Sequence, residues 1–92
     1  MEIQLFGKQN CGKCESTKHK VTHLLGKHGL ESRIRFTFFD METVDGLAEG
    51  AYRDVDLSKI PTTIIEEDGR DLVRWEGIVP DSVEIKQFLG TA

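Results

Sequence analysis

The chain has 92 residues, of which 38% are hydrophobic and 30% charged, and its formal net charge is −4. That length suits one compact domain with one hydrophobic core, so a single domain is predicted over residues 1–92. The acidic balance provides no overall positive field and argues against nucleic-acid binding. No apolar run approaches the roughly 18 residues that a membrane helix needs, and a cytoplasmic protein that does not span a membrane is expected.

The first half of the chain predicts a strand, a helix and a second strand. Residues 2–6 alternate apolar and polar side chains and end at Gly7, which is typical of a short strand followed by a loop. Residues 11–28 carry apolar side chains at helical spacing, and Gly29 is placed as the C-terminal stop. Residues 33–40 are rich in aromatic and β-branched side chains, with the apolar groups on both faces that an interior strand would have.

A second helix is predicted after Thr43, which can cap it. Its apolar side chains recur at the spacing of an amphipathic helix. These side chains are Val44, Leu47, Ala48, Ala51 and Tyr52.

The last part of the chain predicts a hairpin and a helix. Residues 62–67 and 72–75 are strands separated by an Asp-Gly turn. Asp81 and Glu84 then form a capping box, and Gly90 ends the helix. The element order β-α-β-α-β-β-α predicts an α/β fold, in which three helices cover a mixed four-stranded sheet.

The only two cysteines, Cys11 and Cys14, lie in the basic part of the chain. Residues 1–35 hold seven Lys and Arg against three Asp and Glu, whereas residues 36–92 hold five against thirteen. A disulfide that closes so small a loop removes little entropy from the unfolded chain, so it would be a weak structural cross-link. The pair is therefore interpreted as reactive or as metal-binding.

Both cysteines fall where the first strand gives way to the first helix. Unpaired backbone N–H groups and the positive end of the helix dipole stabilise a thiolate there, so the pKa of Cys11 should lie below the ordinary value of about 8.5. Lys8 and Lys13 add positive charge in the same direction. On a helical wheel Cys14 points along the apolar stripe, so one thiol is reachable and the other is shielded.

That division suits thiol–disulfide exchange, in which Cys11 attacks a substrate disulfide and Cys14 resolves the mixed disulfide. A C-x-x-C pair at a strand-to-helix junction is a known redox arrangement. Gly12 and Lys13, between the thiols, should tune the reduction potential. The chemistry resides in the chain itself, so no cofactor is required.

Zinc binding is the alternative suggested by the following histidines, because Cys11, Cys14, His19 and His23 are the residue types of a tetrahedral site. The spacing argues against that site. If the helix begins at Cys11, both histidines lie on the solvent side and cannot converge with Cys14 on one ion. A solvated helix face is the favoured interpretation.

A proline immediately precedes the first strand of the hairpin, in the stretch Lys59-Ile60-Pro61-Thr62. Proline lacks a backbone N–H, which confines it to the first residue or the edge of a strand. A cis Ile60–Pro61 bond is possible, but the base rate of about 5–6% favours an ordinary trans bond from the residues alone.

Together, "CGKC" after a first strand and "KIPTT" opening a hairpin resemble the thioredoxin superfamily over essentially the whole chain. The resemblance implies that Cys11 is the nucleophile and Cys14 the resolving thiol. It further implies that Pro61 is a cis-proline, that the main chain of Ile60 meets an extended substrate, and that Thr62 is the residue that commonly follows the proline.

The branch of the superfamily stays open. The short chain resembles the minimal fold of glutaredoxins, and Lys8 matches a lysine that glutaredoxins use toward the glutathione carboxylate. The middle pair of the motif and the segment after the fourth strand depart from the glutaredoxin pattern. Asn10 and Lys13 stand where thioredoxins have a tryptophan and a proline, and Leu5 stands about where they have a buried acid.

The leading hypothesis is a monomeric oxidoreductase that reduces a disulfide in a protein or in a small, glutathione-like thiol. It would be regenerated by a reductase or a thiol as electron donor. Lys8, Lys13 and Lys59 could form a positive rim that steers an acidic partner. Two alternatives are an iron–sulfur cluster held by Cys11 of two monomers, and a redox-inactive interaction module on the same fold.

Overall fold

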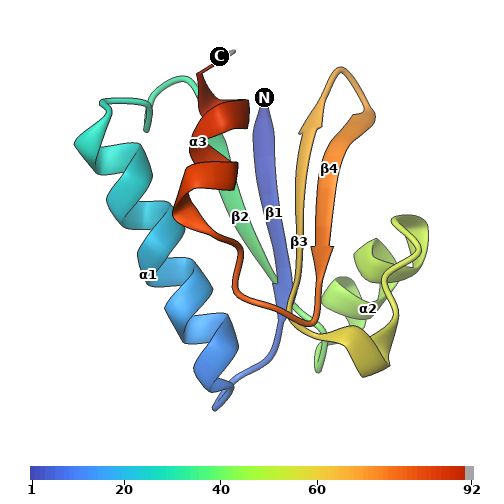
Figure 1. Ribbon diagram of the computed structural model, residues 1–92. Coiled ribbons are helices and arrows are strands. Elements are labelled where there is room, and N and C mark those ends of the chain that lie inside the picture. The colour runs from blue at the N-terminus through green and yellow to red at the C-terminus, as the bar shows by residue number, and fades with distance from the viewer. Residues whose placement is uncertain (91–92) are drawn as a thin grey trace.

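The structure is a computed structural model that describes residues 1–90 (Figure 1). Its elements follow the predicted order, with one additional short 3-10 helix. They are β1 (Glu2–Gly7), α1 (Gly12–Lys27), β2 (Arg35–Asp40), α2 (Val44–Tyr52), the 3-10 helix η1 (Leu57–Lys59), β3 (Thr62–Glu67), β4 (Arg70–Glu76) and α3 (Ser82–Leu89). The predicted α/β fold, with a mixed four-stranded sheet and three α-helices, is confirmed. None of the helices within residues 1–90 has the length and apolarity needed to span a bilayer.

The strand order in the sheet is β2-β1-β3-β4, so β1 and β3 are the interior strands. β1 runs parallel to β2, as a strand-helix-strand crossover requires, and antiparallel to β3, which pairs antiparallel with β4. The prediction that the second strand is interior is wrong, because β2 lies at the edge. It also begins later than predicted, since the amides of Arg33 and Ile34 bond to the carbonyl of Leu30 in a turn.

The apolar side chains on both faces of β2 have a different cause. One face contributes Phe36 to the cluster beneath α1 and α3, while Phe39 on the other face stacks on Phe6 with ring centroids 4.9 Å apart. A strand at the edge of a sheet can thus be covered on both faces, because burial of the faces and hydrogen bonding along the edges are independent.

The main core lies between the sheet and the helices α1 and α3 (Figure 1). Its buried members are Ile3, Val21, Leu24, Leu25, Ile34, Ile65, Trp75, Ile85 and Leu89. The apolar stripe predicted for the first helix therefore faces the sheet. The indole N–H of Trp75 donates to Glu84 Oε2 at 2.9 Å, so this glutamate joins α3 to β4 while Asp81 alone caps the helix.

The opposite face of the sheet carries α2, which packs through its glycines. Gly46 and Gly50 are the buried residues of this helix, whereas Val44 is 82% exposed and Tyr52 79%. A Cβ atom added at Gly46 would collide with the carbonyl of Asp40, so the helix lies directly against the end of β2. The apolar stripe found in the sequence is real, but it faces solvent and does not face the core.

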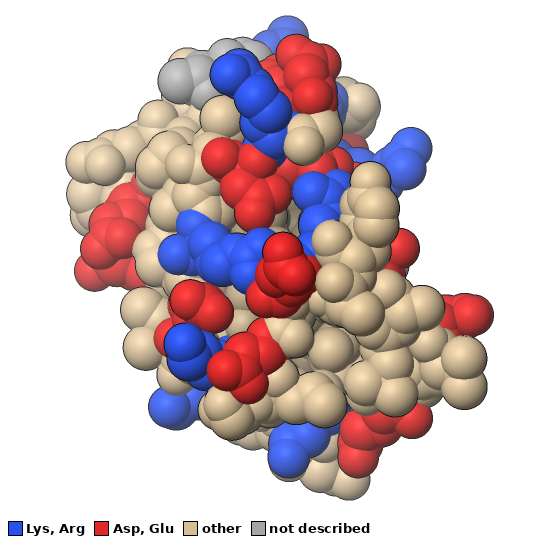
Figure 2. Space-filling view, turned by 90° about the vertical axis from the view of Figure 1, so that its right-hand side faces the viewer, with Lys and Arg blue, Asp and Glu red and all other residues tan. Residues whose placement is uncertain are grey.

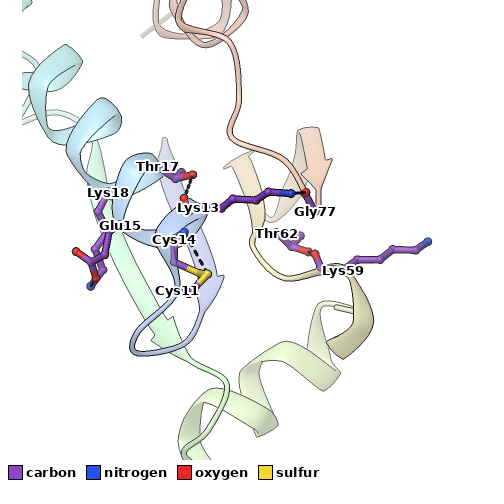
Figure 3. Close-up of a disulfide and its surroundings, with 9 residues drawn as sticks. All are labelled: Cys11, Lys13, Cys14, Glu15, Thr17, Lys18, Lys59, Thr62 and Gly77. Atoms are coloured by element: carbon purple, nitrogen blue, oxygen red, sulfur yellow. Dashed lines mark hydrogen bonds and ion pairs between the residues drawn. A yellow bond between two sulfur atoms is a disulfide. The ribbon is translucent and has the colours of Figure 1, made fainter.

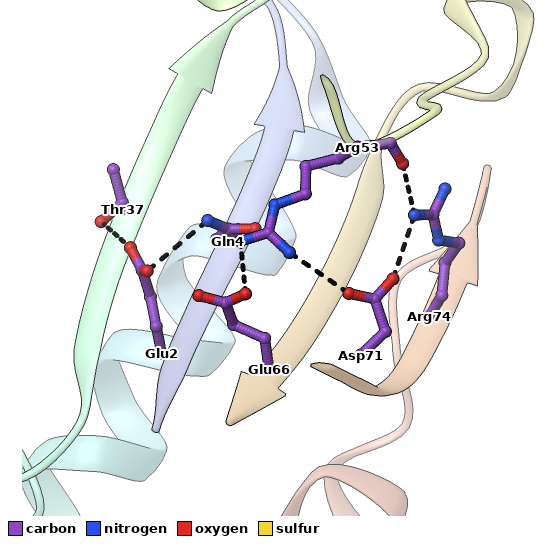
Figure 4. Close-up of polar contacts among 7 residues, drawn as sticks. All are labelled: Glu2, Gln4, Thr37, Arg53, Glu66, Asp71 and Arg74. Atoms are coloured by element: carbon purple, nitrogen blue, oxygen red, sulfur yellow. Dashed lines mark hydrogen bonds and ion pairs between the residues drawn. The ribbon is translucent and has the colours of Figure 1, made fainter. Parts of the chain in front are cut away.

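Beyond α2, the same face of the sheet is covered by charged side chains. Figure 2 views this side of the molecule, where charges crowd the middle and upper parts and largely uncharged surface occupies the lower right. Arg53, just after α2, reaches across the sheet to Glu66 on β3 and to Asp71 on β4 (Figure 4). Arg74 also binds Asp71, at 3.1 Å, and donates to the carbonyl of Arg53.

Candidate active site

Cys11 and Cys14 form a disulfide at the start of α1 (Figure 3). Their Cα atoms lie 5.2 Å apart. Cys11 is the N-cap residue, with extended backbone angles, and its Sγ accepts a hydrogen bond from the backbone N–H of Cys14 at 3.3 Å. Sulfur thus takes the position that a serine or aspartate oxygen occupies in an ordinary N-cap, within the first turn where unpaired N–H groups concentrate.

The two sulfurs differ in accessibility. Cys11 is half-buried, whereas Cys14 is fully buried on the side of α1 that faces the sheet. The close packing of Cys14 against β1 depends on Gly7, because a Cβ atom added there would lie 2.7 Å from Cys14 Sγ. Sequence reasoning identified Gly7 only as the end of a strand, since the contact joins residues in two different elements.

The loop before β3 belongs to the surroundings of the disulfide (Figure 3). The Ile60–Pro61 peptide bond is cis. The carbonyl of Pro61 accepts from the N–H of Gly77 at 2.8 Å, and the hydroxyl of Thr62 donates to the carbonyl of Lys59 at 2.9 Å. Pro61 and Thr62 are also buried, and together with these hydrogen bonds their burial fixes the shape of the loop. The carbonyl of Ile60 accepts no hydrogen bond from the described residues.

Three lysines predicted near the site differ in their contacts. Lys13 extends across the site, and its ammonium donates to the carbonyl of Gly77 at 3.2 Å (Figure 3). Lys59 ends η1, and Lys8 is exposed in the segment between β1 and Cys11. Gly12 is exposed, and a Cβ atom added there would meet nothing within 4 Å. Of the predicted residues, the structure thus joins Lys13 through Gly77 to the Pro61 loop.

Metal binding finds no support in the histidines that follow the cysteines. His19 and His23 are exposed on α1, while Cys14 is buried on its other side. Across residues 1–90, no three His, Cys, Asp or Glu side chains are grouped as metal ligands would be.

Several solved thioredoxins have this arrangement of elements. Thioredoxin-2, a component of the malaria parasite protein secretion machinery, superposes with a TM-score of 0.77 at 18% identity, over 99% of this chain and 82% of that one. The chain has the thioredoxin fold.

Two further structures with the thioredoxin fold cover almost the whole chain. Oxidised thioredoxin O2 from Arabidopsis thaliana matches with a TM-score of 0.75 and 16% identity over 98% of this chain and 72% of that one. Thioredoxin 1 from Thermosipho africanus matches with a TM-score of 0.67 and 16% identity over 100% of both chains. Neither a protein-family model nor a curated protein sequence matches the chain. The resemblance inferred from the two motifs is therefore confirmed at the level of the fold.

Proposed function

We propose that the protein is a thiol–disulfide oxidoreductase that cycles between a Cys11/Cys14 dithiol and a disulfide. The observation that carries the proposal is the asymmetry of the pair: a half-buried Cys11 at the N-cap of α1 is bonded to a fully buried Cys14. A substrate can reach only the first sulfur, and the second is placed to react with the first. Both belong to one short turn, so the disulfide contributes little to the stability of the fold.

In the reductive direction, the Cys11 thiolate attacks one sulfur of a substrate disulfide. The substrate S–S bond breaks, a mixed disulfide forms with Cys11, and the departing substrate thiolate takes up a proton. Cys14 then loses its proton and attacks the Cys11 sulfur, which releases the second substrate thiol and forms the Cys11–Cys14 disulfide. Two electrons pass from the pair to the substrate, and a thiol or a reductase returns them.

The N-cap position is what activates Cys11. The N–H of Cys14, which points at the Cys11 sulfur in the disulfide, can donate to a thiolate at the same place. The dipole of the 16-residue helix α1 adds to this stabilisation. The pKa of Cys11 in the dithiol form is accordingly predicted to lie below the ordinary thiol value, as is usual for cysteines at helix N-termini.

The substrate is proposed to be a disulfide in a protein or in a small, glutathione-like thiol. An extended segment would lie along the Ile60–Pro61 loop. No described residue donates a hydrogen bond to the Ile60 carbonyl, so this carbonyl can accept one from the main chain of a substrate. Gly12, Lys13 and Thr62 are proposed to adjoin this path, and Lys8, which is exposed between β1 and Cys11, is proposed to meet a carboxylate of a small thiol. The protein is proposed to act as a cytoplasmic monomer and without a cofactor.

The decisive experiment compares two serine variants of the same disulfide. Pre-reduced protein is mixed with insulin, and its thiol adducts are followed by mass spectrometry after acid quenching. Cys11→Ser should abolish reaction with insulin, while Cys14→Ser should accumulate a mixed disulfide at Cys11 because the resolving thiol is missing.

Alkylation of Cys14→Ser by iodoacetamide across pH 5–9 gives the pKa of Cys11 directly. A pKa clearly below about 8.5 is expected. The proposal fails if Cys11→Ser reacts with insulin as the parent does, or if Cys11 titrates as an ordinary thiol.

A further inference from the structure

Lys13 connects the two sides of the proposed active site. It lies between the cysteines on the first turn of α1, and its ammonium donates to the carbonyl of Gly77, 64 residues further along the chain. The N–H of Gly77 in turn donates to the carbonyl of Pro61. Figure 3 shows the extended Lys13 side chain passing from the cysteine turn to the loop after β4, next to Thr62. The ammonium is therefore directed from the cysteine turn to the loop after β4.

This ammonium retains binding capacity. A lysine has three N–H donors, and the contact with Gly77 uses one of them. No carboxylate in the described part of the chain forms an ion pair with Lys13, and the same holds for Lys8 and Lys59. Although the chain has 16 acidic residues, none in its described part pairs with Lys13, so the ammonium stays available to a carboxylate of a substrate.

An extended substrate would pass close to this position. A segment that pairs with the main chain of Ile60 and offers its sulfur to Cys11 runs beside the Gly77–Pro61 contact. Successive residues of an extended chain are about 3.3 Å apart, so the residue on either side of the substrate cysteine can reach Lys13 with a side chain of moderate length. A carboxylate there can accept hydrogen bonds from the two unused N–H groups of Lys13 without breaking the bond to Gly77.

We propose that Lys13 is a specificity-determining residue that favours disulfides flanked by an Asp or Glu side chain. The proposal rests on the proposed function and narrows its substrate class to acidic disulfide segments. The contact is exposed to solvent, so the expected preference is modest, roughly 2–5-fold at low ionic strength, and salt should weaken it.

The test uses pairs of synthetic peptides, each with one intramolecular disulfide. The two peptides of a pair differ only by Glu or Gln next to a cysteine, and one pair is made for each side of that cysteine. Second-order rate constants are measured in single turnover for the pre-reduced protein, which removes any need for a physiological electron donor. Each rate constant is divided by that of dithiothreitol with the same peptide, because a nearby carboxylate also changes the intrinsic reactivity of a disulfide.

Lys13→Met is compared with Lys20→Met. Lys20 lies on the same helix, and its ammonium also donates to a carbonyl of the segment between β4 and α3, that of Pro80 at 2.8 Å. The parent and Lys20→Met should prefer the Glu peptide by roughly 2–5-fold, and Lys13→Met should show a ratio near one. The ratio of the two rate constants reports on substrate recognition alone, because a change in the pKa of Cys11 would alter the rate constants for both peptides by the same factor.

The possible outcomes separate the two proposals. Equal rates with both peptides in the parent, or an unchanged preference in Lys13→Met, would overturn the role of Lys13 while leaving the proposed function intact. Failure of the parent to reduce either peptide would overturn both. A preference that disappears only in Lys13→Met, and that declines as salt is added, would establish the substrate class.

Discussion

Helices α1 and α2 lie on opposite faces of one sheet and use their apolar residues in opposite ways. α1 buries Val21, Leu24 and Leu25 in the main core, while α2 buries two glycines and exposes Val44 and Tyr52. Both sequences have apolar residues at helical spacing. Periodicity thus identifies a helix and its two faces, but how closely the helix backbone approaches the sheet decides which face turns inward.

The two sides also differ in what they hold in place. On the α1 side, apolar packing fixes a long helix whose first turn carries the disulfide. On the α2 side, a smaller cluster of Phe6, Met41 and Ile64 lies beneath the glycines, and charged side chains cover the remainder. The proposed chemistry thus depends on the continuous core of the α1 side, because a thiolate at a helix N-terminus needs a rigidly placed helix.

The largest difference in the free energy of unfolding is expected when one side chain is truncated on each side of the sheet. Ile85→Ala on α3 removes a fully buried side chain from the main core and should lower the free energy of unfolding by roughly 2–5 kcal/mol. Val44→Ala on α2 should change it by less than about 0.5 kcal/mol, since the side chain is already exposed. Urea unfolding followed by circular dichroism measures both. Equal losses would mean that the α2 stripe is covered in solution.

Much of this architecture could be predicted from local signals. The caps Thr43 and Asp81 and the positive φ of Gly29 sit where the sequence places them, because each is decided by residues within one turn. The edge position of β2 and the inward glycines of α2 could not be predicted, since both are decided by contacts between distant elements.

The same distinction holds at the candidate site. The C-x-x-C pair and the adjoining proline are short motifs, and the residue types and their spacing are enough to indicate redox chemistry. The contact of Lys13 with Gly77 spans 64 residues, and no periodicity signals it. Likewise, the need for Gly7 beside Cys14 follows only from the packing of α1 on β1.

Glycine substitutions sharpen the comparison at an intermediate scale. Gly46→Ala on α2 places a Cβ atom against the backbone carbonyl of Asp40, which cannot move without disturbing β2. A loss of roughly 1–3 kcal/mol in the free energy of unfolding is expected. Gly26→Ala on α1 meets nothing closer than Glu31 Oε2 at 4.0 Å, so helix propensity should dominate and stabilise the protein by about 0.5–1 kcal/mol. A stabilising Gly46→Ala would show that α2 stands away from the sheet.

A third difference between the sides concerns the ion pair of Arg53 and Glu66, whose side chains are 15% and 13% exposed. Glu66→Gln should cost about 1–2 kcal/mol, because it leaves the Arg53 charge on the sheet with only the weaker contact to Asp71. Glu67→Gln is the control, since Glu67 is 42% exposed and lies 4.0 Å from the N-terminal amine.

Burial lowers the pKa of Arg53, but the hydrogen bond and charge of Glu66 outweigh it and raise the pKa above the ordinary arginine value. A raised pKa contributes stability that is fully present below the unfolded value and is lost only as pH rises through the folded one. The pKa of Arg53 lies far above neutrality in both the folded and the unfolded state, so Arg53 stays charged between about pH 6 and 9. Its contribution to the difference in the free energy of unfolding between Glu66→Gln and the parent should therefore stay constant over that range. Denaturation curves at several pH values test this, and a difference that vanishes toward pH 9 would mean that the pair does not hold the α2 side to the sheet.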